Sequence, residues 1–227
     1  MVLTLAERIE KVQERIELAA QRSGRNAGEI TLIGVSKTVD RSTVDEAYAL
    51  GLRHFGENRV QDALAKFSTP LPPDATLHLI GQLQTNKVGQ ALKLSPVVHS
   101  VDRPSLIAEL DRRTGLNGQS IEVLLQVNIA GEEQKAGADP LDALSLAEQI
   151  ISSPNLDLRG LMTMAPLVPD AESARPTFRG LRELRDSLTT RLAIDLPWLS
   201  MGMTNDFEIA IEEGATHVRV GRAIFEP

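Results

Sequence analysis

The strongest constraint on the fold of this chain is a regular alternation of short apolar runs with longer amphipathic stretches. The runs are too short for helices of ordinary length, and glycine, proline, aspartate or asparagine flanks them, which is typical of buried strands. Eight such runs occur among the 227 residues, at 30–36, 53–55, 76–80, 97–101, 121–128, 156–162, 198–200 and 217–220.

The stretches between these runs predict helices. The first stretch, before any strand, repeats its apolar residues at steps of three and four, and Gly24 follows as a plausible end. Later stretches begin after capping residues such as Asp40, and Pro140 suits the first turn of another helix. Strands that alternate with helices indicate a parallel sheet. About eight such units in one chain of this length predict an α/β protein, a single (β/α)8 TIM-type barrel with an extra N-terminal helix, formed as one domain over residues 1–227.

Composition excludes several classes of function. The formal charge of −7 and the 3% of aromatic residues argue against a nucleic-acid-binding surface. The chain has no cysteine, which removes disulfides, thiol nucleophiles and cysteine-ligated metals and fits a reducing cytoplasm. The four histidines stand far apart in the sequence and form no zinc motif, so metal catalysis has little support. No apolar run approaches the roughly 18 residues of a membrane span, so we expect a cytoplasmic protein without membrane contact.

Lys37 is the first candidate for chemistry. It directly follows the first predicted strand, at the carboxyl end where the active sites of barrels lie. A lysine in a low-dielectric mouth has its charged form disfavoured, so its amine becomes a usable nucleophile toward an aldehyde. A solvated lysine at a strand end explains the position equally well. Lys135, in a polar loop over the mouth, is the main rival but has no strand to fix it.

The loops after the seventh and eighth strands form a candidate phosphate site. In barrels these two loops, with a short helix, frequently bind phosphate. Glycines there allow a close approach of the backbone, and hydroxyl groups add donors. Alternatively, the glycines serve only tight turns. The candidates are Ser200, Met201, Gly202 and Thr204 in the first loop and Gly221 and Arg222 in the second.

The alternation of side chains in the last strand points Arg219 into the barrel, where a buried cation needs partners. A cofactor with an aromatic ring, anchored at Lys37 and at the phosphate loops, would bring its ring nitrogen to Arg219, which stays cationic and would oppose protonation of that nitrogen. The alternative is a structural pair with a carboxylate such as Glu57. Asn58 could contact a ring hydroxyl, and His78 is as readily an interior histidine as a ligand contact.

The chain resembles the pyridoxal phosphate homeostasis family of YggS-like proteins, which are similar to the N-terminal barrel of alanine racemase. Seven ordered segments carry the resemblance: V-S-K-T at 35–38, F-G-E-N-R-V-Q at 55–61, H-L-I-G-Q-L-Q-T-N-K at 78–87, Q-V-N-I with E-E-Q-K-A-G at 126–137, R-G-L-M-T-M-A-P at 159–166, L-S-M-G-M-T-N-D at 199–206 and A-T-H-V-R-V-G-R-A-I-F at 215–225.

The resemblance implies pyridoxal 5'-phosphate (PLP) joined to Lys37 as a Schiff base, with Ser200, Thr204 and the amides of Gly221 and Arg222 on the phosphate. It also places Arg219 by the ring nitrogen and Asn58 near the ring. It implies a role in intracellular PLP homeostasis and amino-acid balance without evident catalysis. The protein that receives the cofactor stays unidentified, and we expect a monomer, with a dimer left open.

Two other functions stay open. One is a PLP-dependent enzyme similar to an amino-acid racemase, although racemisation needs proton donors on both faces of the α-carbon. The chain has one tyrosine, Tyr48, which falls in a predicted helix, and it ends at Pro227 without a predicted second domain to cover the mouth. The other is a phosphate-binding barrel enzyme that does not use PLP.

Overall fold

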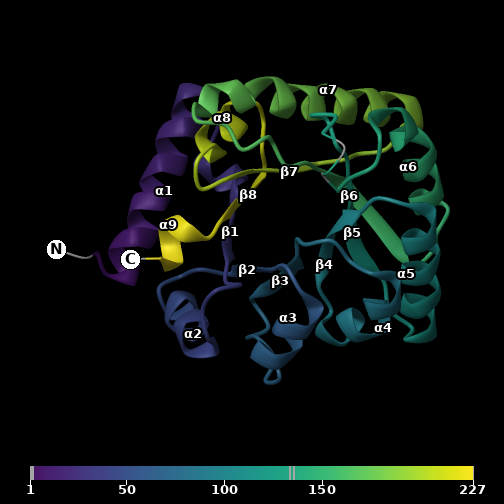
Figure 1. Ribbon diagram of the computed structural model, residues 1–227, viewed down its shortest axis with the longest axis horizontal. Coiled ribbons are helices and arrows are strands. Elements are labelled where there is room, and N and C mark those ends of the chain that lie inside the picture. Colours follow the sequence, from purple (N-terminus) through teal and green to yellow (C-terminus); the bar gives the residue numbers. More distant parts are fainter. Residues whose placement is uncertain (1–2, 133, 135, 227) are drawn as a thin grey trace.

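The computed structural model describes residues 3–132, 134 and 136–226. In this part of the chain eight parallel strands close into a barrel in sequence order, with β1 paired to both β2 and β8. The predicted (β/α)8 barrel is therefore confirmed (Figure 1). The strands are β1 (Thr31–Val35), β2 (His54–Glu57), β3 (Thr76–Leu79), β4 (Val97–Val101), β5 (Ile121–Gln126), β6 (Leu156–Met162), β7 (Trp198–Met203) and β8 (His217–Val220).

The helices surround the barrel, as Figure 1 shows. None of those that the structure describes combines the length and apolar character that a membrane crossing requires. The α-helices are α1 (Leu5–Arg22), α2 (Arg41–Ala49), α3 (Val60–Lys66), α4 (Val88–Ala91), α5 (Pro104–Leu116), α6 (Ala143–Ile151), α7 (Arg175–Leu192), α8 (Phe207–Glu212) and α9 (Arg222–Phe225). Short 3₁₀ turns lie at Ala27–Glu29, Thr85–Lys87, Leu92–Leu94, Pro140–Asp142 and Ala171–Ala174.

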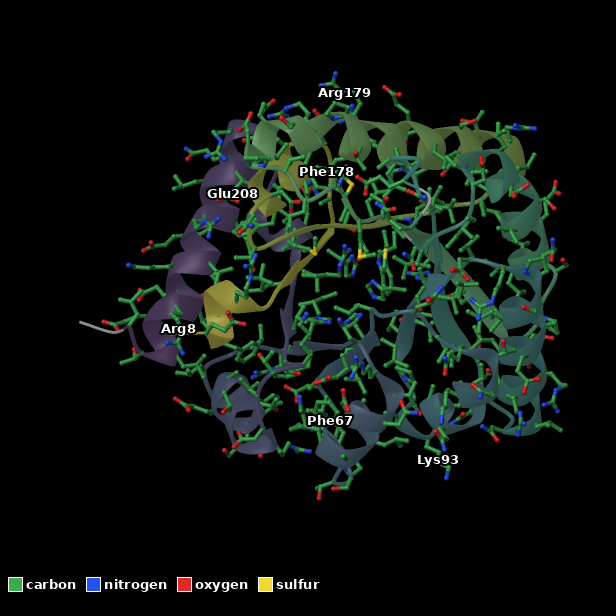
Figure 2. The ribbon with its side chains drawn as sticks, viewed as in Figure 1. Arg8, Phe67, Lys93, Phe178, Arg179 and Glu208 are labelled. Carbon is green, nitrogen blue, oxygen red and sulfur yellow. The ribbon has the colours of Figure 1, made fainter. Side chains whose placement is uncertain are left out.

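Each strand presents one set of side chains to the helices and the other to the barrel interior. On β5, Val123 and Leu125 belong to the apolar layer beneath the helices, whereas Leu124 belongs to a small inner cluster. The helices complete the outer layer with one face each. On α7, Phe178 is buried against this layer and Arg179 points away from it (Figure 2).

The extra N-terminal helix begins where the sequence predicted. Thr4 caps α1 by accepting the N–H of Glu7, and the backbone N–H of Thr4 donates to the Glu7 carboxylate, which forms a capping box. The apolar face of α1 is buried, and α1 packs against α8 and α9 (Figure 1). Arg8 Nε donates to the carbonyl oxygen of Ile224 at 2.6 Å. The first helix is thus bound to the segments that follow β7 and β8, on which the predicted phosphate loops lie.

A buried ion pair supports the end of β1. Lys66 Nζ on α3 lies 2.6 Å from Glu57 Oε1 on β2, and the exposed fractions of the two side chains are 9% and 0%. Ser36 Oγ donates to the same carboxylate oxygen at 2.8 Å, and Lys66 also donates to the carbonyl oxygen of Ser36. These bonds hold the residue that directly precedes Lys37.

Breaking this pair is expected to be costly, because the remaining charge would be buried without a partner. Lys66→Met should lower the free energy of unfolding by about 3–5 kcal/mol, measured by urea denaturation. Asp45→Asn, which breaks the more exposed pair of Arg41 with Asp45, is the control and should cost no more than about 1 kcal/mol. Equal losses in the two variants would contradict this interpretation.

Candidate functional site

A cavity of 660 Å³ opens at the carboxyl ends of the strands, where the active sites of barrels lie. Its volume is in the usual range for a small-molecule site. The walls combine a few polar groups with apolar and methionine side chains. The residues that line it are Val35, Lys37, Asn58, Ile80, Gly81, Gln82, Gln126, Ala136, Met164, Ala165, Pro166, Leu167, Val168, Ala171, Met203, Thr204, Asn205, Asp206, Arg219, Gly221, Arg222 and Glu226.

Six of the residues that the sequence singled out for PLP binding meet in this cavity. They lie at the carboxyl ends of four strands, β1, β2, β7 and β8, and include both Lys37 and Arg219, together with Asn58, Thr204, Gly221 and Arg222. Lys37 is exposed, which differs from the low-dielectric surroundings expected from the sequence. The physical reason is its position two residues beyond the end of β1, past the last strand residue, Val35.

Ser200 and Met201 are placed elsewhere and do not appear among the described residues of the cavity wall. Both are fully buried in β7. Met201 belongs to the apolar layer beneath the helices, since strand residues alternate between the two faces. Ser200 lies in the interior, where its hydroxyl contacts Arg219 and His99.

Arg219 is the buried cation of the site, with 4% of its surface exposed. Its Nη1 donates to Ser200 Oγ at 2.7 Å and its Nη2 donates to the carbonyl oxygen of Thr163 at 2.9 Å. The alternative pair with Glu57 is wrong, because Glu57 pairs with Lys66. Burial lowers the pKa of Arg219 to about 10, and the nearby Asp206 opposes this shift. The group therefore stays cationic at neutral pH.

A tight turn at the end of β7 shapes the side of the cavity next to Thr204. Gly202 has φ +91°, and a Cβ atom there would lie 2.6 Å from the Cβ of Ala210, so the turn and helix α8 pack closely. Asp206 Oδ1 accepts the N–H of Met203 at 2.6 Å and closes the turn. The pKa of Asp206 is raised by its burial, although the hydrogen bond from Met203 and the charge of Arg219 oppose this shift.

Gly221 forms another close approach at the rim. A Cβ atom at this position would lie 3.2 Å from the carbonyl oxygen of Val35. A side chain would therefore press β8 away from β1 where both reach the cavity. The residue fits a position at which the backbone itself forms the wall of a ligand site.

The four histidines come together in the barrel interior, although they are far apart in the sequence. His54, His78 and His99 are joined by contacts between ring nitrogens of 3.0 and 2.8 Å, and the ring of His217 lies 6.3 Å from those of His78 and His99. His78 is thus an interior histidine with partners on both sides. Among the described residues, no group of three or more histidine, cysteine or acidic side chains could hold a metal ion.

The sequence reasoning missed other residues of the cavity wall. Asp206 was quoted only within the segment 199–206 that carries the resemblance, and Leu167 and Val168 after β6 were not assigned to the site. Their position just beyond β7 and β6 is the signal that could have found them. The rival lysine, Lys135, lies outside the described residues.

Comparisons with known proteins agree with this architecture. The family model described as alanine racemase, N-terminal domain, matches residues 9–226. The pyridoxal phosphate homeostasis protein of Aquifex aeolicus is 44% identical over 223 residues, which cover 98% of each chain.

Solved structures show the same barrel. PipY of Synechococcus elongatus PCC7942, in a structure with PLP bound, has a TM-score of 0.83 and 40% identity, covering 98% of this chain and all of PipY. An alanine racemase of Clostridium difficile has a TM-score of 0.74 at 10% identity, and the match covers 93% of this chain but 55% of the racemase, so it shows the fold alone. On the identity to relatives across almost its whole length, this chain belongs to the pyridoxal phosphate homeostasis protein family.

Proposed function

We propose that the chain binds PLP in the cavity at the carboxyl ends of the strands and acts in PLP homeostasis. The observation that carries this proposal is the meeting of Lys37, Arg219 and the two C-terminal loops around one cavity of suitable volume. The amine of Lys37 would form a covalent link with the aldehyde of the cofactor. The membership of the family and the PLP-bound structure of PipY support the choice of cofactor.

The remaining groups fit the other parts of PLP. Thr204 supplies a hydroxyl donor, and the backbone at Gly221 and Arg222 begins α9, whose first N–H groups have no partner within the helix. These three residues would hold the phosphate. Asn58 would lie near the ring, and Arg219 would donate to the ring nitrogen. Ser200 would act behind Arg219 rather than on the phosphate.

Arg219 also favours a role as a carrier or homeostasis factor over catalysis. PLP supplies an electron sink when its ring nitrogen carries a proton, and a cationic donor at this nitrogen opposes that protonation. The tyrosine Tyr48 does not offer a proton donor at the cavity, because it lies on α2 and its hydroxyl donates to Asp74. Amino-acid balance would then follow from the supply of the cofactor.

We also propose that the barrel acts as one cofactor-binding domain, as a monomer in the cytoplasm. A chain without cysteine fits a reducing compartment. Sedimentation of the purified protein tests the monomer, since a dimer would have twice the mass of 24.7 kDa.

Lys37→Ala should abolish the covalent attachment of PLP. Borohydride reduction of the wild-type protein with PLP, followed by peptide mass mapping, should place the adduct on the peptide that holds Lys37. The matched control Lys135→Ala should keep this adduct. An adduct on another lysine, or none at saturating PLP, would overturn the proposed site.

The carrier role predicts slow exchange of the α-proton of amino acids. Wild-type protein with PLP and L-alanine in deuterated water should incorporate deuterium no more than about tenfold faster than free PLP at the same concentration, because general acid–base catalysis by positioned side chains typically supplies at least a hundredfold. Proton NMR measures the incorporation. Exchange at rates typical of enzymes, about 1 per second or more, would favour the racemase-like alternative.

A further inference from the structure

We infer that Ser200 and His99 are positioning residues for Arg219, at the end of a hydrogen-bonded chain of three histidines that crosses the barrel interior. The chain runs from Arg219 through Ser200, His99 and His78 to His54. Its successive contacts measure 2.7, 2.9, 2.8 and 3.0 Å. The inference rests on the proposed function where it concerns the effect of Arg219 on PLP.

Arg219 sets the direction of every bond in this chain. A guanidinium has only donors, so the Ser200 hydroxyl must accept from Nη1. The contacts that the described residues make with this hydroxyl are those of Arg219 and His99. The hydroxyl proton is then donated to His99 Nδ1. In the reverse direction this proton would be buried without an acceptor, which is unfavourable.

The direction of donation assigns the same tautomer to each histidine. Because Nδ1 of His99 accepts, its proton is on Nε2, which donates to Nδ1 of His78. The same reasoning puts the proton of His78 on Nε2, which donates to Nδ1 of His54. His54 keeps its proton on Nε2. It lines a second cavity, of 420 Å³, at the opposite end of the barrel.

The chain requires neutral rings, because a protonated ring would turn a donor toward another donor. Burial lowers the pKa of His54. It lowers the pKa values of His78 and His99 well below the usual value, and neighbouring charges lower these two further. Burial also lowers the pKa of His217 to about 3. The titratable or charged groups that face the interior or line its two ends are Glu29, Lys37, His54, His78, His99, Glu122, Asp206, His217, Arg219, Arg222 and Glu226.

The hydrogen-bonded chain ends at Arg219, which lines the cavity, so it can hold the guanidinium in one orientation there. Nη1 of Arg219 is fixed by Ser200 and Nη2 by the carbonyl oxygen of Thr163. Without Ser200 the guanidinium would keep one of these two bonds and could turn in the cavity. Its alignment with a ring nitrogen would then be lost.

The first test needs no PLP. In protein labelled with ¹⁵N on histidine, only the four histidines of the protein give ring nitrogen signals. Long-range proton–nitrogen NMR spectra should show His54, His78 and His99 neutral with the proton on Nε2, and His78 and His99 should not titrate near the usual pKa of about 6.5. A proton on Nδ1 of His78 or His99, or a normal titration of either, would overturn the proposed chain.

The second test measures PLP binding and the visible spectrum of the bound cofactor. Ser200→Ala and His99→Asn should weaken PLP binding roughly tenfold, the effect of one lost hydrogen bond to a charged group, and should shift the absorption band. Ser200→Thr, which keeps the hydroxyl, should restore both. His217→Gln removes an interior imidazole that does not belong to the hydrogen-bonded chain, and it should leave the visible spectrum of bound PLP unchanged.

The outcomes separate the two proposals. If the wild-type protein forms no adduct with PLP, the proposed function fails. The NMR spectra still decide whether the hydrogen-bonded chain of histidines exists. If the wild-type protein binds PLP and Ser200→Ala binds it with the same affinity and spectrum, the positioning role is wrong. If Ser200→Ala does not fold, Ser200→Thr, His99→Asn and the wild-type spectra decide.

Discussion

The closed barrel imposes one constraint on every strand residue: a side chain faces either the apolar layer beneath the helices or a narrow interior. Polar groups that face the interior cannot reach bulk water, so they must pair with one another. The interior of this barrel satisfies this requirement with Ser200, the histidines and the carbonyl oxygen of Thr163 around Arg219. The site depends on this arrangement because Arg219 belongs both to the interior network and to the wall of the cavity.

A buried ion pair outside the described cavity wall supports the backbone next to Lys37. The pair of Glu57 and Lys66 holds Ser36, and therefore the backbone next to Lys37. The exposed Lys37 side chain thus extends from a held backbone, whereas the guanidinium of Arg219 is buried and hydrogen-bonded to Ser200 and Thr163. An exposed amine and a buried cation in the wall of one cavity suit the proposed PLP site, since the cation can orient a ring while the amine reacts.

The same barrel occurs in an alanine racemase at 10% identity, so the fold alone does not decide the chemistry. What matters is which groups surround the cofactor. In this chain the Tyr48 hydroxyl donates to Asp74 on the outside of the barrel, and the ionisable side chains of the described cavity wall are those of Lys37, Asp206, Arg219, Arg222 and Glu226. These groups fit the proposed PLP site, whereas racemisation would need proton donors placed on both faces of a substrate.

The sequence by itself determined the number and order of the strands, the extra helix and the position of Lys37, Asn58, Thr204, Gly221 and Arg222 at strand ends, because apolar periodicity and turn residues are local properties. It also placed Arg219 inside, since strand residues alternate. Only the tertiary structure decided the partners of these residues. Ser200 accepts a hydrogen bond from Arg219, and Glu57 pairs with Lys66. The four histidines lie together in the interior, although His54 and His217 are 163 positions apart in the sequence. Closure of the barrel brings eight distant strands around one axis, and no local pattern records which interior side chains will meet at the same height.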